Sequence, residues 1–235
     1  VLIMLDTSGS MGGSNLAAAK AALESLLTKF KELGNVKVQL ATFNEDVNGT
    51  TSGWISVDSA INLLDDISTG GGTNYDYALD IMESAFAQSG KLSDAKNVSY
   101  FLSDGIPTLS SDNDGDAVGG SNSGSRYDPD KGDGIDDDPI DSEVDAWTDF
   151  LSASGNEITS YAVAIGDNVD AQHLDPIAYD GANDIGMDAI IPSELDNLAQ
   201  ELVDSVANLG QNFVGNANAN AMVAGLGEDF MTGND

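Results

Sequence analysis

The chain has 235 residues, which suits one α/β domain with an insertion or a tail, and its apolar fraction of 41% is enough for a buried core. It carries 40 acidic and 8 basic residues, a net charge of −32, and residues 132–235 contain no Lys or Arg. This charge argues against nucleic acid and anionic membrane surfaces as partners. A halophilic or merely very soluble protein would have the same charge, so the balance alone does not define a function.

The sequence has no Cys, so no disulfide holds the fold together. No apolar run approaches the roughly 20 residues of a membrane span, which argues against membrane insertion. Val1 lies inside an apolar run with no Met before it. We therefore expect a monomeric domain cut from a longer chain.

Apolar runs alternate with segments of helical spacing along the chain. Strands are predicted at 1–5, 36–43, 47–57, 97–102, 158–165 and 189–191. Helices are predicted at 14–33, 59–67, 74–88, 141–154 and 194–209, the last with Ser193 as its N-cap. Side chains expected in the core include Trp54, Val57, Tyr77, Ile81 and Phe86. The pattern predicts a doubly wound, mainly parallel six-stranded sheet with one antiparallel edge strand at 47–57 and helices on both faces.

Oxygen-bearing side chains follow two of these strands. Asp6, Ser8 and Ser10 come directly after the first strand, Asp104 follows the strand at 97–102, and Thr73 lies after three glycines. Ligands of open parallel sheets bind beyond the carboxyl ends of the strands, so these loops should meet at one edge. Carboxylates and hydroxyls select Mg²⁺ or Ca²⁺ over zinc or copper. Helix capping would explain Asp6 and Ser8 but neither of the other loops.

The set Asp6-x-Ser8-x-Ser10, Thr73 and Asp104 resembles the metal-ion-dependent adhesion site (MIDAS) of von Willebrand factor A domains, over roughly residues 1–209. The resemblance implies a Rossmann-like sheet of order 3-2-1-4-5-6. It also implies that the hydroxyls contact Mg²⁺ or Ca²⁺ directly, while the two carboxylates act mainly through water. An open position on the ion would then accept an acidic group from a protein or glycan partner.

An acidic segment at 107–139 interrupts the alternation of strands and helices, and glycines space its carboxylates as in calcium-binding loops. A solvated, disordered loop is the alternative. We favour Ca²⁺ here because charges this dense need a cation to become ordered. The candidate ligands are Asp112, Asp114, Asp116, Asp128, Asp130, Asp133, Asp136 and Asp138.

The sequence predicts a domain boundary after residue 211. The Gly- and Asn-rich tail at 212–235 resembles, in part, the start of the calcium-binding nonapeptide repeats of RTX proteins. That resemblance implies a large bacterial adhesin exported by type I secretion, located outside the cell or on its surface.

Three functions compete at this stage. The first is a metal-dependent adhesion module that could serve biofilm attachment. The second is a calcium-rigidified spacer between adhesin repeats and the RTX region, with no external ligand. The third is a metal-dependent enzyme, such as a phosphohydrolase or a chelatase-type subunit, which we do not expect because no basic residues are available near the site to clamp a phosphate.

Overall fold

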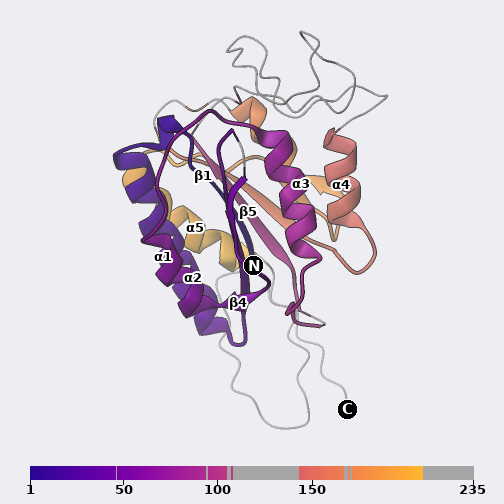
Figure 1. Cartoon of the computed structure of the whole chain (residues 1–235). Helices are drawn as coiled ribbons and strands as arrows, with labels where there is room; N and C mark the ends of the chain where they lie inside the picture. Colours follow the sequence, from indigo (N-terminus) through magenta and orange to yellow (C-terminus); the bar gives the residue numbers. More distant parts are fainter. Residues whose placement is uncertain are drawn as a thin grey trace.

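The computed structural model describes residues 1–45, 47–93, 95–104, 107, 143–166, 169 and 171–208 (Figure 1). The predicted boundary at 211 and the tail at 212–235 lie outside these residues. So does the insertion at 107–139 apart from Pro107, and with it every candidate calcium ligand. Within the described part of the chain, none of the helices has the length and apolar character needed to cross a membrane.

One twisted sheet forms the centre of the molecule. Its strands are β1 (Leu2–Asp6), β2 (Lys37–Phe43), β3 (Val47–Thr50), β4 (Ile55–Ser56), β5 (Val98–Ser103), β6 (Thr159–Ala164), β7 (Tyr179–Asp180) and β8 (Ile185–Gly186). They run in the order β3-β2-β1-β5-β6-β7-β8, with β4 also paired to β2. The four central strands β2, β1, β5 and β6 are parallel, and the short strands at both edges are antiparallel.

Helices cover both faces of this sheet (Figure 1). They are α1 (Ser14–Leu33), α2 (Val57–Leu64), α3 (Tyr75–Phe86), α4 (Glu143–Ser152) and α5 (Leu198–Asn208). Four 3-10 turns, η1 to η4, lie at Gly9–Met11, Ala171–His173, Asp175–Ile177 and Leu195–Asn197. α1, α2 and α5 pack in one apolar cluster, while α3 and α4 pack in the other.

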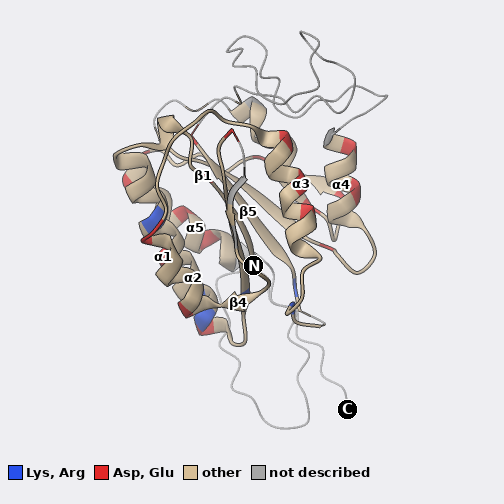
Figure 2. Cartoon of the chain, viewed as in Figure 1, with Lys and Arg blue, Asp and Glu red and all other residues tan. Residues whose placement is uncertain are grey.

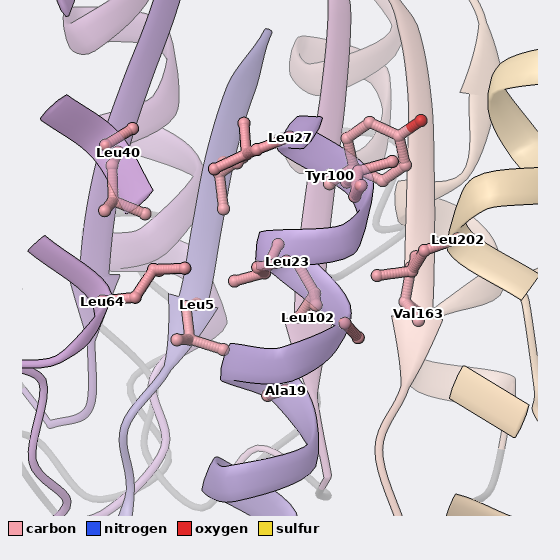
Figure 3. Packing of buried hydrophobic residues seen from close by; sticks show 14 of the residues in the cluster. Leu5, Ala19, Leu23, Leu27, Leu40, Leu64, Tyr100, Leu102, Val163 and Leu202 are labelled. Carbon is pink, nitrogen blue, oxygen red and sulfur yellow. The ribbon is translucent and has the colours of Figure 1, made fainter. Parts of the chain in front are cut away.

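Strand β1 shows why the sheet has two cores. Its residues are all buried, and successive side chains of a strand point to opposite faces. Ile3 and Leu5 accordingly join the cluster of α1, while Leu2 and Met4 join the cluster of α3. Figure 3 shows the first cluster, with the labelled side chains Leu5, Ala19, Leu23, Leu27, Leu40, Leu64, Tyr100, Leu102, Val163 and Leu202. The doubly wound, mainly parallel fold predicted from the sequence is confirmed.

Within the described residues, the sheet has eight strands, whereas six were predicted. The single edge strand predicted at 47–57 is divided into β3 and β4, and a small hairpin, β7–β8, extends the other edge. The strand predicted at 189–191 is reduced to one parallel bridge between Val163 and Ile190.

Two side-chain predictions were wrong. Tyr77 is 42% exposed on α3, because the buried face of this helix is formed by Tyr75, Ala78, Leu79 and Met82, and Tyr77 lies outside it. Ser193 does not cap the last helix, since a 3-10 turn capped by Glu194 intervenes before α5 begins at Leu198. Trp54, Val57 and Phe86 are buried as predicted.

Candidate functional site

The site lies at the carboxyl edge of the two central strands. β1 and β5 are parallel neighbours, with Leu5 opposite Leu102, so Asp6 at the end of β1 lies beside Ser103 at the end of β5. Asp104 is the next residue. Parallel pairing therefore brings together two carboxylates that are 98 positions apart in the chain.

Asp6 is the deepest group of the site, with no exposed surface. Its Oδ1 accepts a hydrogen bond from the backbone N–H of Ser8 at 2.7 Å, and its Oδ2 accepts one from Ser103 Oγ at 2.6 Å. Burial raises the pKa of this carboxyl from 3.8 to about 6, although both hydrogen bonds act in the opposite direction. Neither of the ion pairs among the described residues involves Asp6, so a bound cation would have an uncompensated buried charge to neutralise.

The hydroxyls and the second carboxylate form a chain toward the surface. Ser8 Oγ and Ser10 Oγ are 3.0 Å apart, and Ser10 Oγ donates to Asp104 Oδ1 at 2.9 Å. Asn15, in the first turn of α1, donates from Nδ2 to Asp104 Oδ2 at 2.9 Å. Ser8 is buried and Ser10 is exposed, so this row of oxygens leads from the core to solvent.

Thr73 reaches the site through a loop that is bonded to the Asp6–Ser10 segment. Gly70 N donates to Thr7 O at 2.8 Å, and Gly9 N donates to Gly71 O at 3.0 Å. Asn44 supports the loop from the other side by donating from Nδ2 to Gly70 O at 2.6 Å. Thr73 itself is 3% exposed and precedes the N-cap of α3. The structure thus brings all three predicted loops to one place.

Four further residues shape the site and were not predicted as part of it: Asn15, Asn44, Tyr75 and Ser103. Tyr75 is buried, and its pKa is raised mainly by burial, with the charges of Asp6 and Asp104 adding to the shift and a hydrogen bond with Ser103 opposing it. Ser103 could have been suspected, because it directly precedes Asp104. The two asparagines carry no signal in the sequence, because only the fold brings them to these loops.

The donor set fits a hard divalent cation. It contains two carboxylates and three hydroxyls, and oxygen donors of this kind suit Mg²⁺ or Ca²⁺. Within the described residues, no group of three or more His, Cys, Asp or Glu side chains converges. A metal site built mainly from carboxylates or imidazoles is therefore not found in that part of the chain. If an ion binds here, neutral hydroxyls must supply much of its coordination.

Residues 1–106 match the family model of the von Willebrand factor type A domain. This stretch runs from β1 past β5 and contains all five predicted site residues. Over these residues the chain is similar to a von Willebrand factor type A domain. No curated protein sequence matches it.

Solved structures resemble this chain at low identity. A type V pilus tip protein of Porphyromonas gingivalis matches through its von Willebrand factor domain with a TM-score of 0.57 and 15% identity, covering 91% of this chain and 97% of that chain. The pilus adhesin SpaC of Lactobacillus rhamnosus GG matches with a TM-score of 0.58 and 18% identity, covering 88% of this chain and 30% of that chain.

A third relative was solved with zinc in its MIDAS motif. It is proximal thread matrix protein 1 of the mussel byssus, with a TM-score of 0.57 and 16% identity, and the match covers 88% of this chain and 46% of that chain. The chain therefore spans about half the length of the mussel protein and less than a third of the pilus adhesin. At these identities the three structures show that the chain shares their fold.

Proposed function

We propose that this A domain is an adhesion module that binds an acidic group of a partner through a divalent ion. The observation that carries the proposal is the row of side-chain oxygens that starts at Ser8 Oγ, 3.0 Å from Ser10 Oγ, and ends at Asp104 Oδ1, 2.9 Å from Ser10 Oγ. Buried Asp6 lies at its inner end, where its Oδ1 accepts a hydrogen bond from the Ser8 backbone N–H at 2.7 Å. This row ends at solvent, because Ser8 is buried and Ser10 is exposed.

By resemblance to the A-domain site, Ser8, Ser10 and Thr73 would hold the ion directly, and Asp6 and Asp104 would hold it mainly through water. The bound ion would supply an electrophilic position that a partner carboxylate can fill. Neighbouring residues of the chain would orient the two carboxylates. Ser103 and the Ser8 amide fix the direction of Asp6, and Asn15 fixes Asp104.

The partner would be a protein or a glycan with an acidic group, and the ion would be Mg²⁺ or Ca²⁺. A net charge of −32 repels polyanions, so contact with an acidic ligand needs a cation between the two. The same charge makes nucleic acid an unsuitable partner. We propose no catalytic activity, because none of the hydrogen bonds described above at Asp6, Ser8, Ser10 and Asp104 comes from a Lys or Arg that could clamp a phosphate.

We place the module at the bacterial surface or in the extracellular space, as part of an RTX adhesin exported by type I secretion. Two relatives with the same fold are pilus proteins, one named a pilus adhesin and the other a tip protein, which supports a surface role. The acidic insertion would bind Ca²⁺ outside the cell and stiffen the rim of the site.

The competing proposal is a calcium-rigidified spacer with no external ligand. In that case an acidic side chain of the same polypeptide would cap the ion. The exposure of Ser10 favours the adhesion module, because the outer end of the oxygen row is open among the described residues.

An array of glycans and matrix proteins, probed in Mg²⁺, in Ca²⁺ and in chelator, tests the proposal. Binding should require a divalent ion and should disappear in Ser10→Ala. Ser25→Ala is the matched control, because Ser25 lies on the exposed face of α1, where its Oγ donates to Ala21 O. Metal binding by calorimetry without any metal-dependent ligand would support the spacer. Unchanged metal affinity in Asp6→Ala plus Ser8→Ala would reject both.

A further inference from the structure

Tyr75 packs in the core beside the buried carboxylate of the candidate metal site. It is the first residue of α3, two positions after Thr73, and it has no exposed surface. Parallel pairing puts Phe43, Asp6 and Ser103 in one row across β2, β1 and β5. Side chains in such a row point to the same face of the sheet, here the face that α3 covers. The ring of Tyr75 therefore lies on the side of the sheet from which Asp6 can be supported.

Two phenylalanine rings fix the position of the Tyr75 ring. Its ring centroid lies 6.0 Å from that of Phe43 and 4.9 Å from that of Phe101, with interplanar angles of 77° and 76°. The two phenylalanine rings are themselves 5.2 Å apart. Edge-to-face contacts at these distances are favourable in their own right. Packing therefore sets where the Tyr75 hydroxyl points, and a phenylalanine at this position would keep the same ring contacts.

The Tyr75 hydroxyl is hydrogen-bonded to Ser103. A serine hydroxyl carries one hydrogen, and Ser103 uses it to donate to Asp6 Oδ2 at 2.6 Å. Ser103 must then accept the hydrogen of the Tyr75 hydroxyl. The three side chains form a relay in which Tyr75 donates to Ser103 and Ser103 donates to Asp6. In a buried chain of this kind each hydrogen bond polarises and strengthens the next.

The helices on this face offer no positive charge that could hold Asp6 instead. The sequences of α3 and α4 contain Asp and Glu and neither Lys nor Arg, as Figure 2 shows. Neither of the ion pairs among the described residues involves Asp6. The direction of this carboxylate therefore depends on the Ser8 amide and on the relay.

We propose that Tyr75 is a positioning residue of the metal site, which acts through Ser103 to hold Asp6 in the direction that a divalent ion needs. Because Tyr75 follows Thr73 by two positions, it also ties the segment that carries one predicted ligand to the strand that carries another. This role rests on the divalent-metal site proposed above. A tyrosine that only fills the core would need its ring and not its hydroxyl, so removal of the hydroxyl separates the two roles.

Tyr75→Phe in the full chain, titrated with Mg²⁺ by calorimetry, tests the hydroxyl. We expect the affinity to fall about threefold to tenfold, the size expected for one hydrogen bond. Tyr100→Phe is the matched control. Tyr100 is equally buried, its hydroxyl lies 2.9 Å from Ser205 Oγ, and its ring meets Phe30 edge to face, but on the opposite face of the sheet. Both variants should lower the melting temperature, and only Tyr75→Phe should weaken Mg²⁺ binding.

A double-mutant cycle with Ser103→Ala tests whether Tyr75 acts through Ser103. Once the serine hydroxyl is absent, Tyr75→Phe should cause no further loss of Mg²⁺ affinity. The same cycle, followed by urea unfolding in chelator, gives a readout that needs no metal. There the double variant should be less destabilised than the sum of the two single variants, whereas Tyr100→Phe and Ser103→Ala should add.

The possible failures are distinguishable. If the wild-type chain binds no divalent ion, both the metal site and this role of Tyr75 are rejected. If the wild-type chain binds Mg²⁺ and Tyr75→Phe binds it equally well, only the role of Tyr75 is overturned. Additive effects of Tyr75→Phe and Ser103→Ala on Mg²⁺ affinity would likewise overturn it, because the hydroxyl would then not act through the serine.

Discussion

Ser103 Oγ donates to Asp6 Oδ2 at 2.6 Å, from the end of one central strand to the end of the next. The Ser8 amide holds the other carboxylate oxygen at 2.7 Å. The two bonds fix the carboxylate plane of a group that is fully buried. The fold therefore orients Asp6 before an ion binds. Its side chain then loses little conformational entropy when the ion binds.

Ser103→Ala should weaken Mg²⁺ or Ca²⁺ binding about tenfold or more while leaving the fold intact, because residues that orient ligands typically contribute this much. Isothermal calorimetry on the purified chain measures the change. Ser99→Ala is the control, since Ser99 lies on the same strand, is equally buried, and has an Oγ without a hydrogen-bond partner among the described residues. An equal loss of affinity in both variants would show that β5, and not the Ser103 hydroxyl, is responsible.

Gly71→Ala should damage the Thr73 loop. Gly71 has φ +81°, and an added Cβ would lie 3.1 Å from the Asn44 side chain that supports the loop. A left-handed conformation costs a non-glycine residue about 1–2 kcal/mol, so we expect a lower melting temperature together with weaker metal binding.

Gly70→Ala provides the comparison for this change. A Cβ at Gly70 would meet nothing within 4 Å, and its backbone is outside the left-handed region. Thermal unfolding and calorimetry should therefore give values close to wild type. Equal behaviour of the two alanine variants would mean that the loop tolerates rearrangement and does not position Thr73.

The sequence was informative where one local pattern decides the structure. The apolar run before Asp6 predicts a buried strand, and parallel strands must end at one edge, so the meeting of Asp6 with Asp104 followed from the pattern. Tyr77 shows the limit of this reasoning. Its ring fits a helical spacing with Ile81, but the buried face of α3 is formed by Tyr75, Ala78 and Met82, which leaves Tyr77 toward solvent.

The supporting residues of the site could not be predicted in the same way. Asn15 reaches Asp104 across 89 positions, and Asn44 reaches Gly70 across 26. An asparagine in a turn or an early helical position has many ordinary roles, such as capping. Only the packed arrangement of α1 against the sheet shows which of them orients a carboxylate.

Calcium should raise the melting temperature of the chain, because an ion that binds only the folded state stabilises it by mass action. Differential scanning calorimetry in Ca²⁺ and in chelator measures the rise. Asp6→Asn separates its sources: the part lost in this variant belongs to the site at the end of β1, and the part retained belongs to other sites, including those proposed for residues 107–139. No rise in the wild type would contradict calcium binding throughout the chain.

Asp6→Asn should also make the metal-free protein more stable at neutral pH. The folded-state pKa of Asp6 is raised from 3.8 to about 6, so the folded state favours the protonated form. Below pH 3.8 the carboxyl is protonated in both the folded and the unfolded state and does not reduce the free energy of unfolding. As the pH rises from 3.8 toward 6, the unfolded state ionises first, and the free energy of unfolding falls by up to about 3 kcal/mol.

Asparagine keeps an acceptor for the Ser8 amide without the charge, so the variant avoids this cost. Urea unfolding in chelator between pH 4 and pH 8 measures the free energy of unfolding of both proteins. We expect the difference between them to grow with pH toward about 3 kcal/mol, the cost derived from the pKa shift of Asp6. General repulsion among carboxylates changes with pH in both proteins and cancels in the comparison. A difference in unfolding free energy that stays constant over this range would mean that the Asp6 charge is compensated in the metal-free protein. Asp6 would then need no cation to neutralise it.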